Sequence, residues 1–129
     1  MPNQIEDHPL YTIPVGPLGL IPMNGCQPLC EKVDAYLAMW RQQRKHSPEN
    51  SLSFLEYQKD SYIIDAAVPR FGSGEAKGVI KQSVRGDDLY SLVDVCNYSL
   101  TYSLCGNINH MSPDDHFQDL KRIIAAVGG

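Results

Sequence analysis

The glycine-rich segment from residue 70 to residue 86, RFGSGEAKGVIKQSVRG, constrains the fold more than any other part of the sequence. It places Gly72 and Gly74 directly after the aromatic residue Phe71. Glycine adopts positive φ angles at little cost, so these positions favour a tight, hairpin-like turn. A short β-branched patch, Val79-Ile80, follows this turn. The segment therefore predicts a hairpin-like turn at its start and a second turn at its end, with the Phe71 ring and the Glu75 carboxylate on a mobile connection.

The second turn of this segment carries groups that suit a phosphate. Ser83 supplies a hydroxyl and Arg85 a guanidinium, and Gly86 follows them. A guanidinium binds phosphate oxygens through paired, charge-assisted hydrogen bonds. The alternative reading of the whole segment is an ordinary loop that joins two strands.

Helical periodicity appears first between residues 29 and 45, where apolar side chains recur every three or four positions with charged residues between them. The sequence predicts an amphipathic helix there, ending at the Ser47-Pro48-Glu49-Asn50 stretch. We expect its aromatic residues to face the core rather than a ligand. The apolar set is Leu29, Val33, Tyr36, Leu37 and Trp40.

A second helix is predicted from residue 113 to the end of the chain. Ser112 is placed as the N-cap, Pro113 occupies the first helical position, and the acidic residue Asp115 stands three positions after the cap. The glycine pair at 128–129 marks the helix end. The expected buried face consists of Phe117, Leu120, Ile124 and Val127.

Three apolar runs are predicted as strands, at residues 18–23, 61–68 and 88–95. The last run is apolar on both faces, as in a parallel sheet covered by helices on both sides. The polar stretch 96–110 is expected to be a long loop. Strands and helices in this order predict an α/β domain with a largely parallel sheet, spanning residues 17–129 after an N-terminal arm at 1–16. Ligands in such a sheet bind beyond the carboxyl ends of the strands, near Asp94.

Composition narrows the class of protein. The chain has 129 residues, about one domain, and a net charge of −4, which argues against a nucleic-acid partner held by a basic surface. We expect no membrane span, because no apolar run approaches the roughly 18 residues required. The start lacks the basic and apolar regions of a signal peptide, so we expect a cytoplasmic protein with four reduced cysteines.

The order F-x-x-G-E, then S-V-R-G, then an apolar strand, resembles the N-terminal domain of the ribose-phosphate pyrophosphokinase (phosphoribosyl pyrophosphate synthetase) family, in a divergent, bacterial-type branch. The likeness is strongest over residues 60–129. It implies a phosphoribosyltransferase-like, three-layer α/β fold. It also implies transfer of the diphosphoryl group of ATP to ribose 5-phosphate, with Mg²⁺ neutralising the phosphates, in an enzyme that assembles as a homo-oligomer.

The resemblance assigns roles to five residues. Phe71 matches the aromatic residue that packs on adenine, and Glu75 matches the acid that receives the adenine amine. Ser73 stands in the same ATP-binding turn, where the family usually has Asp or Asn. Ser83 and Arg85 match positions that bind phosphate or a nucleotide effector in regulated members.

The family's catalytic residues match nothing in this chain, because its catalytic histidine, its basic flexible loop and its ribose-phosphate loop would follow position 129. The resemblance therefore implies an N-terminal domain that does not catalyse the transfer alone. One alternative is a non-catalytic regulatory or oligomerisation domain of the same family. Another is a small metal-dependent hydrolase that uses His110, Asp114, Asp115 and His116, whose side chains suit Zn²⁺ or Mn²⁺.

Overall fold

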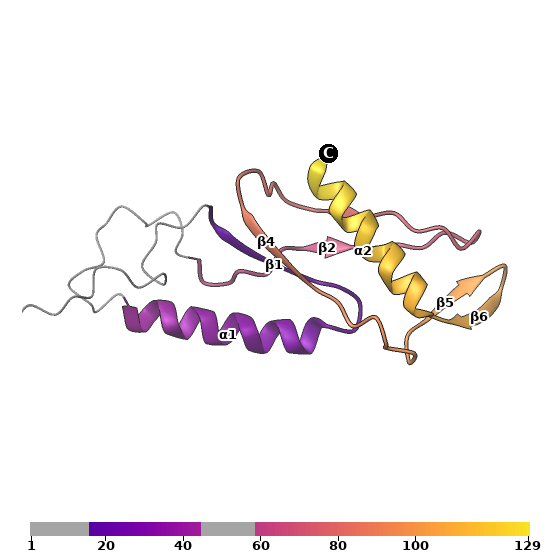
Figure 1. Cartoon of the computed structure of the whole chain (residues 1–129), viewed down its shortest axis with the longest axis horizontal. Coiled ribbons are helices and arrows are strands. Elements are labelled where there is room, and N and C mark those ends of the chain that lie inside the picture. The colour runs from indigo at the N-terminus through magenta and orange to yellow at the C-terminus, as the bar shows by residue number, and fades with distance from the viewer. Residues whose placement is uncertain (1–15, 45–58) are drawn as a thin grey trace, which may run out of the picture.

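A computed structural model of the chain describes residues 16–44 and 59–129. The predicted N-terminal arm, except for its last residue, and the predicted end of the first helix at 47–50 lie outside these residues. The described residues form a mixed α/β structure with two helices and three small sheets. Figure 1 shows the two helices on either side of the central strands.

The central strand is β1, which spans Leu18–Pro22. It pairs in parallel with β4, Asp88–Leu92, in a register that sets Leu20 opposite Tyr90. On its other edge β1 makes an isolated parallel bridge to Ile63. Two hydrogen bonds of 2.8 Å flank that bridge, from Leu20 N–H to the Tyr62 carbonyl and from Ile64 N–H to the Leu20 carbonyl. The largely parallel sheet that the sequence predicted is therefore limited to the β1–β4 pair and the single parallel bridge between β1 and Ile63.

The remaining strand pairs are antiparallel. β2, Ala66–Ala67, pairs with β3, Val79–Ile80, so the predicted strand at 61–68 is reduced to the bridge at Ile63 and these two residues. β5, Thr101–Leu104, pairs with β6, Asn107–His110. The prediction of a long loop at 96–110 was wrong, because ten of these residues form a β-hairpin.

Local geometry explains this hairpin. Its two central residues, Cys105 and Gly106, have φ angles of 50° and 84°. Positive φ at both central positions is what a two-residue type I′ turn requires. A two-stranded hairpin can form without a continuous run of apolar residues. The polar composition of this segment therefore led to the wrong prediction of a loop.

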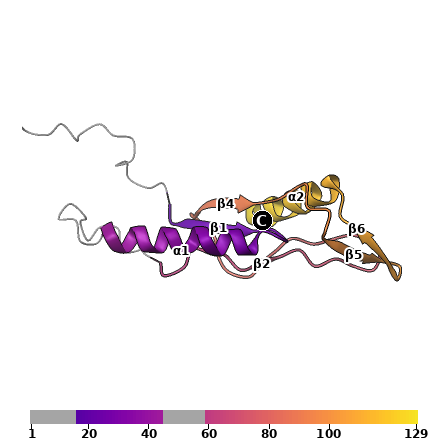
Figure 2. The ribbon, with the colours of Figure 1, turned by 90° about the horizontal axis from the view of Figure 1, so that it is seen from below.

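The two helices pack on opposite faces of β1, as Figures 1 and 2 show. Successive strand side chains point to opposite faces. Leu20 packs with Cys30 of α1, Gln27–Arg44, whereas Ile21 packs with Ile123 of α2, Pro113–Gly128. Each face of the parallel pair thus has its own small core.

The first helix is confirmed, and two residues of its predicted face, Val33 and Leu37, are half-buried against the core, whereas the other three are exposed. Leu29, Tyr36 and Trp40 are 57%, 59% and 51% exposed. Cys30 and Asp34 are buried instead. The Asp34 carboxylate accepts hydrogen bonds from Tyr62 N–H, at 2.6 Å, and from a neighbouring serine hydroxyl, and these bonds hold this polar side of the helix against the sheet.

The second helix begins as predicted, but it turns a different face to the core. Ser112 and Asp115 form a complete capping box, with the proline at the start of the helix. The predicted buried residues Phe117 and Ile124 are 51% and 60% exposed. The same correction applies to Val127, at 36% exposed, whereas Leu120 is half-buried. The buried residues are His116, Asp119 and Ile123.

Close backbone contact fixes α2 against the segment before β3. A Cβ atom added at Gly78 would lie 2.3 Å from the Arg122 carbonyl oxygen, which is inside van der Waals contact. Only a residue without a side chain allows this approach.

We therefore expect Gly78→Ala to lower the free energy of unfolding by about 1–3 kcal/mol, because the helix backbone must move away. The matched control is Gly72→Ala, where an added Cβ meets no atom within 4 Å. The control should change stability by less than about 0.5 kcal/mol. Urea denaturation followed by circular dichroism measures both values, and equal stabilities of the two variants would contradict this packing.

Candidate functional site

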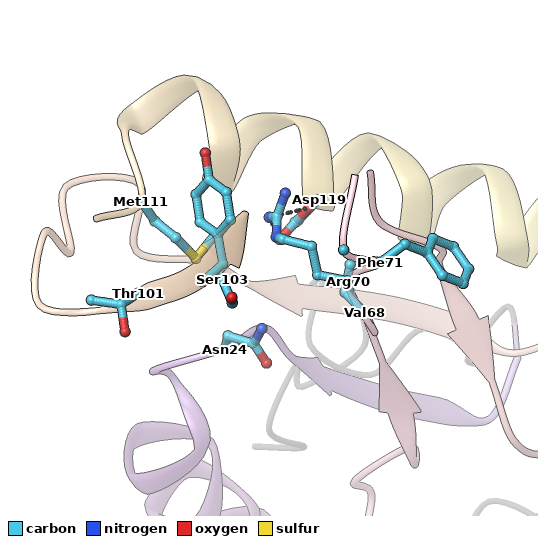
Figure 3. A pocket seen from close by; sticks show the side chains of 10 residues that line it. Asn24, Val68, Arg70, Phe71, Thr101, Ser103, Met111 and Asp119 are labelled. Carbon is cyan, nitrogen blue, oxygen red and sulfur yellow. Dashed lines mark hydrogen bonds and ion pairs between the residues drawn. The ribbon is translucent and has the colours of Figure 1, made fainter. Parts of the chain in front are cut away.

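A cavity of about 320 Å³ lies between α2, the β5–β6 hairpin and the chain before the glycine-rich turn (Figure 3). Asn24, just after the end of β1, forms part of its wall, so the cavity lies beyond the carboxyl end of that strand, as expected for an α/β sheet. Asp94 does not line it and instead accepts a hydrogen bond from Cys96 N–H. The lining residues are Asn24, Val68, Arg70, Phe71, Gly72, Thr101, Tyr102, Ser103, Met111 and Asp119.

A buried ion pair forms one side of this cavity. The Arg70 guanidinium bonds both carboxylate oxygens of Asp119, at 3.0 and 3.2 Å, and Arg122 bonds the same carboxylate at 2.9 Å. The side chains of Arg70 and Asp119 are only 12% and 5% exposed. Removing either partner would leave a charge in a poorly solvated place, which is costly. The pair therefore fixes the start of the glycine-rich segment to the middle of α2.

Arg70 makes two further contacts that reach beyond the helix. Its guanidinium donates a hydrogen bond of 2.8 Å to the Gly74 carbonyl, inside the glycine-rich turn. The guanidinium carbon also lies 4.3 Å from the centre of the Tyr102 ring, at the distance of a cation–π interaction. One side chain thus connects α2, the hairpin and the turn.

The turn from Phe71 to Glu75 is tight, as the sequence predicted. Phe71 N–H donates to the Glu75 carbonyl at 2.7 Å, and Gly74 N–H donates to the Phe71 carbonyl at 2.9 Å. Gly74 has a φ of 92°, which a residue with a side chain rarely adopts. The Phe71 ring is 54% exposed and lies at one edge of the cavity in Figure 3. Ser73 and Glu75 are exposed on the turn and do not line the cavity.

The second predicted pair lies elsewhere. Ser83 and Arg85 are exposed beside a turn closed by a bond from Asp87 N–H to the Val84 carbonyl. This turn adjoins the start of β1, because Asp88 N–H donates to the Pro17 carbonyl at 2.8 Å. The structure therefore separates these two residues from the Phe71 turn, which lies at the hairpin end of the molecule (Figure 1).

The four residues considered for a metal-dependent hydrolase are not brought together. The His110 ring stacks on Tyr98, and a nitrogen of the buried His116 ring hydrogen-bonds the Asn97 carbonyl. Asp115 belongs to the helix cap and Asp114 is exposed. Across residues 16–44 and 59–129 no group of three or more His, Cys, Asp or Glu side chains is placed to hold a metal ion.

Sequence reasoning missed most of the residues that build this site. Arg70 is the first residue of the glycine-rich segment, but a single arginine belongs to no sequence motif that would identify the residue with which it pairs. Asp119 lies 49 positions further along the chain, so only the tertiary structure joins the two. The alternation of Tyr102 and Leu104 with polar residues was the one available signal for the hairpin.

Asp115 has a shifted pKa whose causes oppose one another. Burial alone raises the pKa of this carboxyl. Hydrogen bonds from the Ser112 backbone N–H and hydroxyl, each 2.9 Å long, the positive charge of Arg70 and the electrostatic influence of His116 lower it. The lowering causes prevail, so the pKa lies below the usual value of an aspartic acid.

Comparison of the chain with protein-family models, with curated proteins and with solved structures found no match. Within the described residues, neither helix is long and apolar enough to cross a bilayer. All four cysteines carry free thiols, Cys26 and Cys30 buried and the other two exposed.

The lowered pKa of Asp115 predicts a pH dependence of stability. The folded state binds this proton less readily than the unfolded state, so the stabilisation is complete above the unfolded pKa of about 3.9 and disappears as pH falls through the folded pKa. We expect Asp115→Asn to be less stable than wild type by about 1 kcal/mol at neutral pH, with the difference shrinking below about pH 4.

Urea denaturation at a series of pH values measures this difference. Asp114→Asn is the matched control, because it removes one negative charge from the same helical turn without touching the capping box. Parallel pH profiles for Asp115→Asn and wild type would contradict the assignment.

Proposed function

We propose that this chain is the N-terminal domain of a ribose-phosphate pyrophosphokinase, and that its glycine-rich turn contributes Phe71, Ser73 and Glu75 to the binding of ATP. The observation that carries the proposal is the placement of Phe71. Its ring is half-exposed on a tight turn, and the base of that turn is fixed by the buried Arg70–Asp119 pair. An aromatic ring held at the surface on a rigid base is suited to stack on a nucleobase.

The roles within the turn follow from the chemistry of each side chain. The Phe71 ring offers a flat apolar face to adenine, and the Glu75 carboxylate accepts a hydrogen bond from the exocyclic amine. The Ser73 hydroxyl donates or accepts, where an acidic residue would only accept. Mg²⁺, when bound with ATP, neutralises the phosphates from which the diphosphoryl group passes to ribose 5-phosphate. Residues that perform that transfer belong to a C-terminal half, so this chain alone should be inactive.

The packing of the domain supports a phosphoribosyltransferase-like, three-layer fold for it. A helix lies on each face of the parallel β1–β4 pair, which is the arrangement at the centre of such a fold.

We assign Ser83 and Arg85 to a separate phosphate or effector site. Within the described residues neither side chain has an intramolecular hydrogen bond or ion pair, so the guanidinium and the hydroxyl are both available to a ligand. Their turn lies at the other end of the molecule from Phe71, which suits an effector that does not compete with ATP (Figure 1).

Assembly into a homo-oligomer is the second part of the proposal. The outer side of α2 exposes Phe117, Ile124 and Val127, whose spacings of seven and three positions place them on one face of the helix. A cluster of exposed apolar side chains of this kind favours a contact with another subunit. The same observation favours the alternative, a non-catalytic regulatory or oligomerisation domain of the family.

The test of the ATP site uses Mg-ATP binding to this chain and to a longer protein in which the rest of its reading frame follows. We expect Phe71→Ala to raise the Kd of the longer protein about 5- to 150-fold, because stacking on a base contributes about 1–3 kcal/mol. Tyr90→Ala is the matched control, since that ring is 56% exposed on β4, away from the turn. The proposal fails if the longer protein binds no Mg-ATP, or if Phe71→Ala binds it as tightly as wild type.

The assembly proposal is tested by light scattering and sedimentation of the same longer protein. Ile124→Lys should weaken association by at least about tenfold, because it places a charge in an apolar contact. Gln118→Lys adds the same charge on an exposed position of α2 outside the apolar cluster, and should leave association unchanged. Identical oligomer sizes for Ile124→Lys and wild type at all concentrations would exclude this face as the contact.

A further inference from the structure

The tip of the β5–β6 hairpin packs directly on the glycine-rich turn. Cys105 N–H donates a hydrogen bond of 3.1 Å to the Gly72 carbonyl. The Leu104 side chain lies so close to Gly74 that a Cβ atom added there would be 2.9 Å from its Cδ1 methyl group. Figures 1 and 2 both show the hairpin and the turn side by side at one end of the molecule. Two glycines of the turn are therefore held by backbone and apolar contacts from the hairpin.

The body of the hairpin holds the base of the same turn through Arg70. The Tyr102 ring lies 4.3 Å from the guanidinium carbon, and the same guanidinium donates to the Gly74 carbonyl at 2.8 Å. Asp119 binds the guanidinium from the side of α2 (Figure 3). The Tyr102 ring thus limits the directions in which the Arg70 side chain points, and Arg70 in turn fixes the carbonyl in the middle of the turn.

The hairpin itself is fixed where it joins α2. Met111 N–H donates to the Leu100 carbonyl at 2.8 Å, and the His110 ring stacks on Tyr98 with centroids 4.5 Å apart. The cap of α2 begins at the next residue, Ser112. The hairpin is therefore a stiff connection between the start of the helix and the glycine-rich turn.

We propose that the β5–β6 hairpin positions the glycine-rich turn, and that Tyr102 is a positioning residue that acts on Phe71 through Arg70. A five-residue turn with two glycines has many accessible backbone conformations when it is free, and ordering it on binding lowers affinity. The hairpin restricts the turn before any ligand arrives. The effect of this restriction on nucleotide affinity rests on the proposed function of Phe71. The restriction of the turn by the hairpin does not depend on that function.

The experiment measures amide hydrogen exchange by NMR at Phe71 and Gly74, whose N–H groups close the turn. In the 129-residue chain, Tyr102→Leu should raise exchange at both amides about 3- to 30-fold, because the cation–π interaction is lost. Tyr102→Phe keeps the aromatic face and should restore the wild-type rates. Ile108→Ala is the matched control, since Ile108 belongs to the same hairpin but is 78% exposed.

Exchange of the α2 amides serves as the readout of overall stability. A rise at Phe71 and Gly74 with unchanged α2 exchange supports positioning, because a general loss of structure would raise both. Unchanged exchange at the two amides in Tyr102→Leu, or an equal rise in Ile108→Ala, would overturn the proposal.

Mg-ATP affinity of the longer protein separates this proposal from the proposed function. If Tyr102→Leu loosens the turn and also weakens Mg-ATP binding, both the positioning and the ATP role of the turn are supported. If the turn loosens while Mg-ATP affinity stays at the wild-type value, positioning is supported and the ATP role of the turn fails.

Discussion

The described structure depends most on the buried ion pair between Arg70 and Asp119. Two buried charges are stable only when they are paired and hydrogen-bonded, and Asp119 receives bonds from both Arg70 and Arg122. Because Asp119 is in the middle of α2, the requirement for a partner determines which side of this helix meets the sheet. It also brings the start of the glycine-rich segment to the helix, from 49 positions away in the sequence.

The need to pair buried polar groups also explains why both helices expose some apolar residues that the sequence pattern predicted to be buried. On α2, the face that carries Asp119 and His116 is buried, so Phe117 and Ile124 face outward. On α1, the Asp34 carboxylate accepts hydrogen bonds from the Tyr62 N–H and the Ser61 hydroxyl, and Tyr36 and Trp40 face outward. In each helix, the hydrogen bonds of a buried polar residue determine which side meets the sheet, and several apolar residues remain exposed as a result. The exposed stripes are then available to other subunits or domains, as the proposed assembly requires.

The site combines a rigid base with an exposed tip. Arg70 is held by α2 and by the hairpin, while the Phe71 ring beside it is half-exposed. This arrangement suits a residue that contributes to a ligand site without enclosing the ligand, because the backbone of the turn is held by contacts that the ligand does not use. The Ser83 and Arg85 turn lies near the start of β1 and is independent of these contacts. Two ligand sites on one domain are therefore compatible with its geometry.

The sequence by itself determined the local features of this protein. The Ser112 and Asp115 capping box, the turn after Phe71 and the apolar strand at β1 depend on neighbouring residues, so their chemistry is readable from short stretches. Only the tertiary structure decided which helix faces are buried, that residues 101–110 form a hairpin, and that Arg70 meets Asp119 and Tyr102. Those outcomes depend on contacts between residues that are far apart in the sequence, such as Arg70 with Asp119 and Tyr102. A short stretch of sequence does not indicate which distant residue each of them will contact.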